Sequence, residues 1–68
     1  MVFKNSFKVL EVRKQFGFRQ EDIAITLGVT RQTINAIENE KYNPTLELAM
    51  KLAKLLRTTV EKLFIIDT

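Results

Sequence analysis

Apolar residues recur at helical spacing in several short blocks of the chain. In the clearest block, Ile23, Ala24 and Leu27 fall at i, i+1 and i+4, so they share one face of a helix. This spacing predicts an amphipathic helix from about Gln20 to Leu27.

The next block follows after a short turn. Ile34 and Ile37 are spaced i and i+3, which predicts a second helix from about Arg31 to Asn39. Gly28 stands where a helix end needs a positive φ, and Thr30 suits an N-cap because its hydroxyl can accept from a free backbone N–H. Together the two blocks predict a helix-turn-helix over about residues 20–39.

The rest of the chain has little Gly or Pro, so most of it is expected to be helical. A first helix is expected from Asn5 or Ser6 to Phe16, ended by Gly17. After a loop over Glu40–Pro44, a helix capped by Thr45 should run to about Leu56, followed by a helix over Val60–Leu63 capped by Thr59. Short strands are expected at Val2–Lys4 and Phe64–Ile66. The positions that we expect in the core outside the helix-turn-helix are Val9, Val12, Phe16, Phe18, Leu48, Ala49, Leu52, Leu55 and Leu56. The fold class is therefore all-α, with a small antiparallel sheet formed by the two termini.

Composition limits the functional classes. The chain has 68 residues, enough for one domain over residues 1–68, and it has no Cys and no His. Neither a thiolate metal site nor a His-based active site is possible, and no glycine-rich phosphate loop is present, so we expect no enzyme, no metal, no cofactor and no small-molecule ligand. No apolar run approaches the roughly 20 residues of a membrane span. We therefore expect a cytoplasmic protein without membrane contact, and the net charge of +3 is compatible with nucleic acid.

The chemistry that points to a partner lies at the start of the second helix of the pair. Thr30, Arg31, Gln32 and Thr33 carry hydrogen-bonding side chains where a solvated helix usually carries Lys and Glu. Arg can bond bidentately to guanine and Gln to adenine in the major groove of DNA. Asn35 lies one turn further along the same face. The expected base contacts are therefore Thr30, Arg31, Gln32 and Asn35, with a purely capping role left open for Thr30.

Three segments, GFRQEDIAITLGVTRQTINAIEN, KYNPTLELAMKLAKLL and TTVEKLF, resemble the lambda-repressor-like family, also called the Cro/CI or xenobiotic-response-element family. The resemblance covers roughly residues 9 to 64. It implies a five-helix bundle whose third helix enters the major groove, and a dimer that binds a palindromic operator.

The same resemblance implies roles for single residues. Gln20 would contact the DNA backbone and brace the recognition helix, and Arg13 would pair with Glu38. The residues expected to contact phosphates are Arg13, Arg19, Gln20, Thr33, Asn39, Lys41 and Tyr42.

The chain departs from the family pattern at three places. Arg19 replaces the Ser or Thr that usually caps the second helix. Glu40 replaces a Gly after the third helix, so Asn39 is expected to take the left-handed conformation instead. Arg57 replaces a frequent Gly after the fourth helix. Glu40 also repels phosphates.

Several apolar residues near the termini exceed what the bundle core needs. These residues, which we expect at a homodimer surface beside the terminal sheet, are Phe3, Phe7, Leu10, Ile65 and Ile66. Scattered surface apolar residues are the simpler explanation.

The sequence thus predicts a sequence-specific transcriptional regulator, most plausibly a repressor acting as a homodimer on double-stranded DNA. The alternative is a protein-interaction module such as an antitoxin. RNA binding has little support, because no exposed aromatic platform or basic run is apparent.

Overall fold

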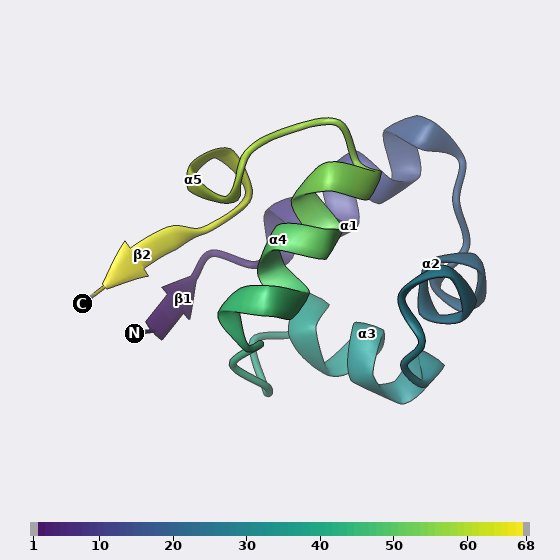
Figure 1. The fold of residues 1–68 in the computed structure, drawn as a ribbon, viewed down its shortest axis with the longest axis horizontal. Helices are drawn as coiled ribbons and strands as arrows, with labels where there is room; N and C mark the ends of the chain where they lie inside the picture. Colours follow the sequence, from purple (N-terminus) through teal and green to yellow (C-terminus); the bar gives the residue numbers. More distant parts are fainter. Residues whose placement is uncertain (1, 68) are drawn as a thin grey trace.

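The computed structural model describes residues 2–67, which form five helices with a two-stranded sheet at one end (Figure 1). The elements are β1 (Val2–Lys4), α1 (Phe7–Phe16), α2 (Gln20–Leu27), α3 (Arg31–Glu38), α4 (Leu46–Leu55), α5 (Val60–Leu63) and β2 (Ile65–Asp67). The expected five-helix bundle with a terminal antiparallel sheet is confirmed. Several boundaries differ by one or two residues, since α1 begins at Phe7, α3 ends at Glu38, and the second strand spans Ile65–Asp67 and not Phe64–Ile66.

The sheet joins the two ends of the chain and is anchored to the bundle. Phe3 lies opposite Ile66 in the antiparallel register. The Phe3 ring packs against Phe64 with ring centroids 5.2 Å apart, and the Phe3 amide donates to Asn43 Oδ1 at 2.9 Å. Phe3 is only 7% exposed, so its assignment to a dimer surface was wrong, because the side chain belongs to the core.

Every helix contributes to a single core. Its buried members are Phe3, Val9, Ile23, Ala24, Ile34, Ile37, Leu48, Ala49, Leu52, Ala53, Leu56, Leu63 and Phe64. The prediction that Phe16 lies in the core was wrong, because its side chain is 42% exposed. It lies at the last position of α1, where it stacks on Phe18 at 5.6 Å between ring centroids. Helical spacing placed it on the correct face, but the neighbouring elements do not cover that end of the helix.

Four helices end in the same way. A residue one or two positions after the helix has a positive φ, and its amide and the next one donate to carbonyls of the last turn, as in a Schellman motif. Gly17 and Gly28 fill this position after α1 and α2, whereas Glu40 and Arg57 fill it after α3 and α4. Asn39 has φ −98°, so the left-handed residue is Glu40 and the expectation for Asn39 was wrong.

The helix starts are capped largely as expected. The hydroxyls of Thr30, Thr45 and Thr59 each accept from the amide three residues later. The Arg19 side chain has no acceptor for a cap, but its backbone amide donates to Asp22 Oδ2 at 2.9 Å. This contact keeps one half of a capping box at the start of α2.

Candidate nucleic-acid interface

Helix α3 lies along one edge of the molecule, with α2 packed beside its first turn (Figure 1). Ile34 and Ile37 are fully buried, whereas Arg31, Gln32 and Asn35 are exposed. The helix therefore divides into a face that anchors it and a face of hydrogen-bonding side chains open to solvent.

The first turn of α3 is rigidly organised. Thr30 Oγ1 accepts from the Thr33 amide at 3.2 Å and lies 3.0 Å from Thr33 Oγ1. Thr30 therefore has a capping role, and its hydroxyl also lies within hydrogen-bonding distance of the Thr33 hydroxyl.

The end of α3 fixes a second polar side chain. Asn39 Nδ2 donates to the Asn35 carbonyl at 2.8 Å and to Asn35 Oδ1 at 3.2 Å. The Asn35 amide group keeps its Nδ2 donors for another acceptor. Asn39, expected at a phosphate, thus orients a neighbour that was expected at a base.

A network of three polar side chains ties α3 to α1 and α2. Arg13 Nε donates to Glu38 Oε2 at 2.7 Å, and Arg13 Nη2 donates to Glu38 Oε1 at 3.2 Å. Gln20 Nε2 donates to the same Oε1 at 2.8 Å. The Arg13 and Glu38 side chains are 12% and 2% exposed, so the pair is largely desolvated. Such a buried pair fixes geometry more reliably than it adds stability. The pair between Arg13 and Glu38 is present, as is a bracing contact from Gln20.

One positioning residue was missed by the sequence reasoning. Ser6 is buried, and its hydroxyl donates to the Ile37 carbonyl near the end of α3. The sequence indicates Ser6 only as a possible helix start. Its hydroxyl makes no cap contact. Serine before a helix usually signals a cap, so no local feature of the sequence indicated this contact across 31 residues.

The starts of α2 and α3 border a polar cleft of about 340 Å³. Arg13, Arg19, Gln20, Glu21 and Arg31 line it. Two helix N-termini add partial positive charge there, which favours an anion. Three of the residues expected at phosphates, Arg13, Arg19 and Gln20, are therefore brought together beside Arg31.

The Asp22 carboxyl at the start of α2 has a lowered pKa. The Arg19 amide donates a hydrogen bond to Asp22, and this lowers the pKa of the Asp22 carboxyl, with a further contribution from the Arg19 side chain. Asp22 therefore stays ionised at the start of α2, where negative charge is favourable.

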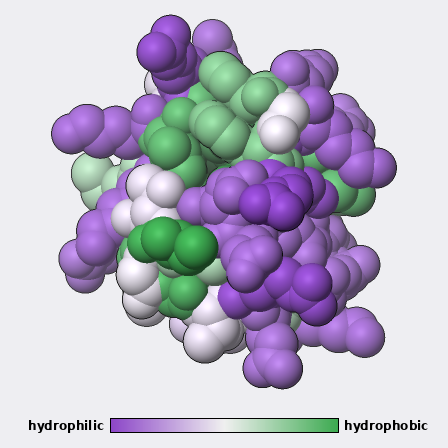
Figure 2. Space-filling view, turned by 90° about the vertical axis from the view of Figure 1, so that its right-hand side faces the viewer, coloured by the Kyte–Doolittle hydropathy of each residue, from purple (hydrophilic) through white to green (hydrophobic). Residues whose placement is uncertain are grey.

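Lys41 and Tyr42 lie at the other end of α3, in the loop that leads to α4. Both side chains are exposed. Glu40 is exposed beside them and brings negative charge to this end. Seen from the α2 side, hydrophilic side chains cover much of the surface, interrupted by smaller hydrophobic patches (Figure 2).

Comparison with known proteins identifies the fold family. A helix-turn-helix family model of the Cro/CI type matches residues 9–63. The chain belongs to this family. It is a DNA-binding transcription regulator of the helix-turn-helix class.

Relatives come from archaea and bacteria. An uncharacterized HTH-type transcriptional regulator of Methanocaldococcus jannaschii is 47% identical over 64 residues, which cover 94% of each chain. Similar regulators occur in Archaeoglobus fulgidus, 43% identical over 60 residues (88% of this chain and 86% of the relative), and in Bacillus subtilis, 47% identical over 57 residues (84% and 86%).

The fold is also similar to a solved structure. The crystal structure of apo-HppE matches 91% of this chain with a TM-score of 0.80 and 26% sequence identity. The HppE chain is longer, and the present chain spans 36% of its length. Within residues 2–67 no helix is both long enough and apolar enough to cross a membrane.

Proposed function

We propose that the protein is a sequence-specific repressor that binds a palindromic operator as a homodimer and inserts α3 into the major groove. The observation that carries this proposal is the exposed row of Arg31, Gln32 and Asn35 on a helix whose opposite face is fully buried. A rigid helix that presents Arg and Gln at its N-terminal end suits the docking geometry of a recognition helix.

Base contacts are assigned to Thr30, Arg31, Gln32 and Asn35. Arg31 is the main candidate for guanine, since its guanidinium is exposed and makes no ion pair within residues 2–67. Gln32 is the candidate for adenine. Thr30 contributes to a contact only through the part of its hydroxyl that the cap leaves free.

Phosphate contacts are assigned to two groups that flank this row. One group lines the cleft at the starts of α2 and α3, and the other lies at the end of α3. Their members are Arg13, Arg19, Gln20, Thr33, Asn39, Lys41 and Tyr42. Contacts on both sides fix the register of a helix on the duplex, but they carry no sequence information.

Selection of bound sites from random duplex DNA, at a stated salt concentration, tests the proposal. Recovery of a palindrome with half-sites about 10 base pairs apart supports a two-fold dimer. Recovery of no preferred site would refute sequence-specific binding.

Fluorescence anisotropy with the selected site then tests Arg31. We expect Arg31→Ala to weaken binding to that site by about 5- to 150-fold, equivalent to about 1–3 kcal/mol, and to relax the preference at one base pair. Lys41→Ala is the control, because loss of a phosphate contact should weaken all sequences equally and lower the salt dependence by about one unit. Equal losses for Arg31→Ala on selected and random DNA would assign Arg31 to the backbone.

A further inference from the structure

Two exposed asparagines at the end of α3, Asn35 and Asn39, form a side-chain pair. Asn39 Nδ2 lies 2.8 Å from the backbone carbonyl of Asn35 and 3.2 Å from Asn35 Oδ1. A carbonyl only accepts, so the atom of Asn39 in these contacts is its amide nitrogen. The atom of Asn35 that faces it is then the oxygen, because two amide nitrogens cannot pair. The backbone carbonyl therefore fixes which way round both amide groups lie.

This pairing divides the hydrogen-bonding groups of Asn35 between the protein and a partner. Asn39 holds Asn35 Oδ1 toward the end of the helix, close to the carbonyl of Asn35 itself. Within residues 2–67, Asn35 Nδ2 makes no hydrogen bond of its own. An unpaired Asn presents both groups to adenine, accepting from N6 and donating to N7. Asn35 instead presents its donors and withholds its acceptor.

We propose that Asn39 sets the base specificity of Asn35, which becomes a donor that selects guanine or thymine and rejects adenine. The inference rests on the proposed function, in which Asn35 contacts a base in the major groove. Guanine shows the acceptors O6 and N7 there, and thymine shows the acceptor O4. Adenine shows N7 beside the N6 donor, and that donor would lose its partner if Asn35 only donates.

The same hydrogens of Asn39 cannot serve DNA at the same time. An amide nitrogen carries two hydrogens, and the two oxygens of Asn35 take both. A phosphate contact from Asn39 would require one of these bonds to break. The inference therefore makes Asn39 a positioning residue, in place of the phosphate contact assigned to it above. The two roles differ in outcome, because a phosphate contact carries no sequence information.

Site selection with wild type, Asn35→Ala and Asn39→Ala tests the inference. The base pair at which Asn35→Ala loses its preference is the one that Asn35 contacts. We expect wild type to select guanine or thymine there. Fluorescence anisotropy on matched duplexes should then show that Asn39→Ala raises the affinity for adenine, relative to the selected base, by at least about fivefold, because the freed Oδ1 completes a bidentate contact. General damage to α3 would weaken every base and would not create a preference for adenine.

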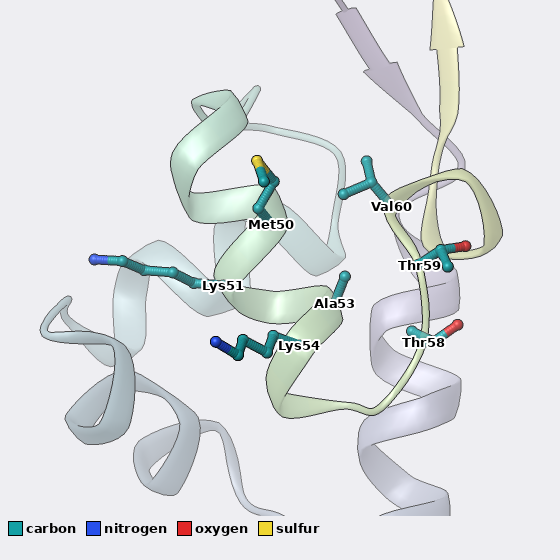
Figure 3. Close-up of a pocket in the computed structure, with 7 residues that line it drawn as sticks. All are labelled: Met50, Lys51, Ala53, Lys54, Thr58, Thr59 and Val60. Atoms are coloured by element: carbon teal, nitrogen blue, oxygen red, sulfur yellow. The ribbon is translucent and has the colours of Figure 1, made fainter.

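Three controls accompany the Asn39→Ala variant. In an Asn35→Ala background, Asn39→Ala should change no base preference, because the group that it positions is gone. Lys41→Ala should weaken all sequences without a change of preference. Lys54→Ala should also leave the preference unchanged, since Lys54 lines a groove between α4 and the start of α5 and belongs to neither α2 nor α3 (Figure 3). Circular dichroism melts verify that each variant is folded.

The outcomes separate this inference from the proposed function. Selection of adenine by wild type, or no gain for adenine in Asn39→Ala, overturns the inference while sequence-specific binding stands. An equal loss on all sequences returns Asn39 to a phosphate contact and also overturns it. If Asn35→Ala alters no base preference, Asn35 contacts no base and the inference fails. Recovery of no preferred site by wild type overturns the proposed function and the inference together.

Discussion

Glu40 occupies a backbone position that suits glycine, so Glu40→Gly should stabilise the protein. Its φ of 58° lies in the left-handed region at the end of α3, where α1 and α2 use Gly17 and Gly28. A residue with a Cβ atom costs about 1–2 kcal/mol in this conformation. The carboxylate adds to the cost, because negative charge is unfavourable at the C-terminal end of a helix dipole.

The expected gain in the free energy of unfolding is the relief of backbone strain and of the unfavourable charge, minus the cost of the larger conformational entropy that glycine gives the unfolded chain. Replacement by Gly removes the strain of about 1–2 kcal/mol but costs about 0.5–1 kcal/mol in the flexibility of the unfolded chain. Removal of the carboxylate contributes about 0.3–1 kcal/mol more. The net gain is about 1 kcal/mol, which for a domain of this size raises Tm by about 4–8 °C.

Thermal melts at one fixed protein concentration test this, with Glu40→Ala as the matched control. The Ala variant removes the charge but keeps the strained φ, so it should gain only the electrostatic part. Arg57→Gly, at the equivalent position after α4 with φ 56°, should gain less than Glu40→Gly because it gives up a favourable cation. Gly17→Ala should lose about 1 kcal/mol from backbone strain alone, since an added Cβ meets no atom within 4 Å. Equal melting temperatures for Glu40→Gly and Glu40→Ala would refute the reasoning.

Two further predictions concern ionised groups. Glu38→Ala should lower the free energy of unfolding in urea by about 3 kcal/mol, because it leaves Arg13 buried without its partner. Glu47→Ala, at an exposed pair, should lower it by less than about 0.5 kcal/mol. Similar losses for the two variants would show that burial does not govern the Glu38 pair. The pKa of Asp22 is lowered by the Arg19 amide, so its stabilisation is complete above the ordinary value of 3.8 and is lost as pH falls through the lowered pKa. The difference in Tm between wild type and Asp22→Asn should therefore be constant from pH 7 to 5 and shrink toward pH 2, and a difference that grows on acidification would contradict this.

Local rules predicted most of the helical framework. The threonine caps and the Gly17 and Gly28 helix ends depend on a few neighbouring residues, so spacing and residue type are enough to find them. The error over Asn39 has a physical reason: a Schellman ending requires the left-handed residue one position beyond the cap, and the hydrogen bonds of α3 place that position at Glu40.

Contacts between distant segments could not be predicted in the same way. Phe3 and Phe16 are both aromatic residues near the end of an element, yet one is buried against Phe64 and the other is exposed. The difference depends on which segments cover the two rings. For Phe3 the covering residue is Phe64, which lies 61 residues further along the chain. The hydroxyl of Ser6 likewise meets α3 only when the bundle has formed.

These long-range contacts bear directly on how DNA would be read. Helix α3 has eight residues, too few to be stable alone in water, so its orientation comes from its surroundings. Ser6 holds the Ile37 carbonyl, while Arg13 and Gln20 hold Glu38. Side chains that make no base contact therefore set the angle at which Arg31 would meet a base. A substitution in this network should consequently reduce discrimination between DNA sequences even where Arg31 is unchanged, because small errors in position weaken a bidentate contact more than a phosphate contact.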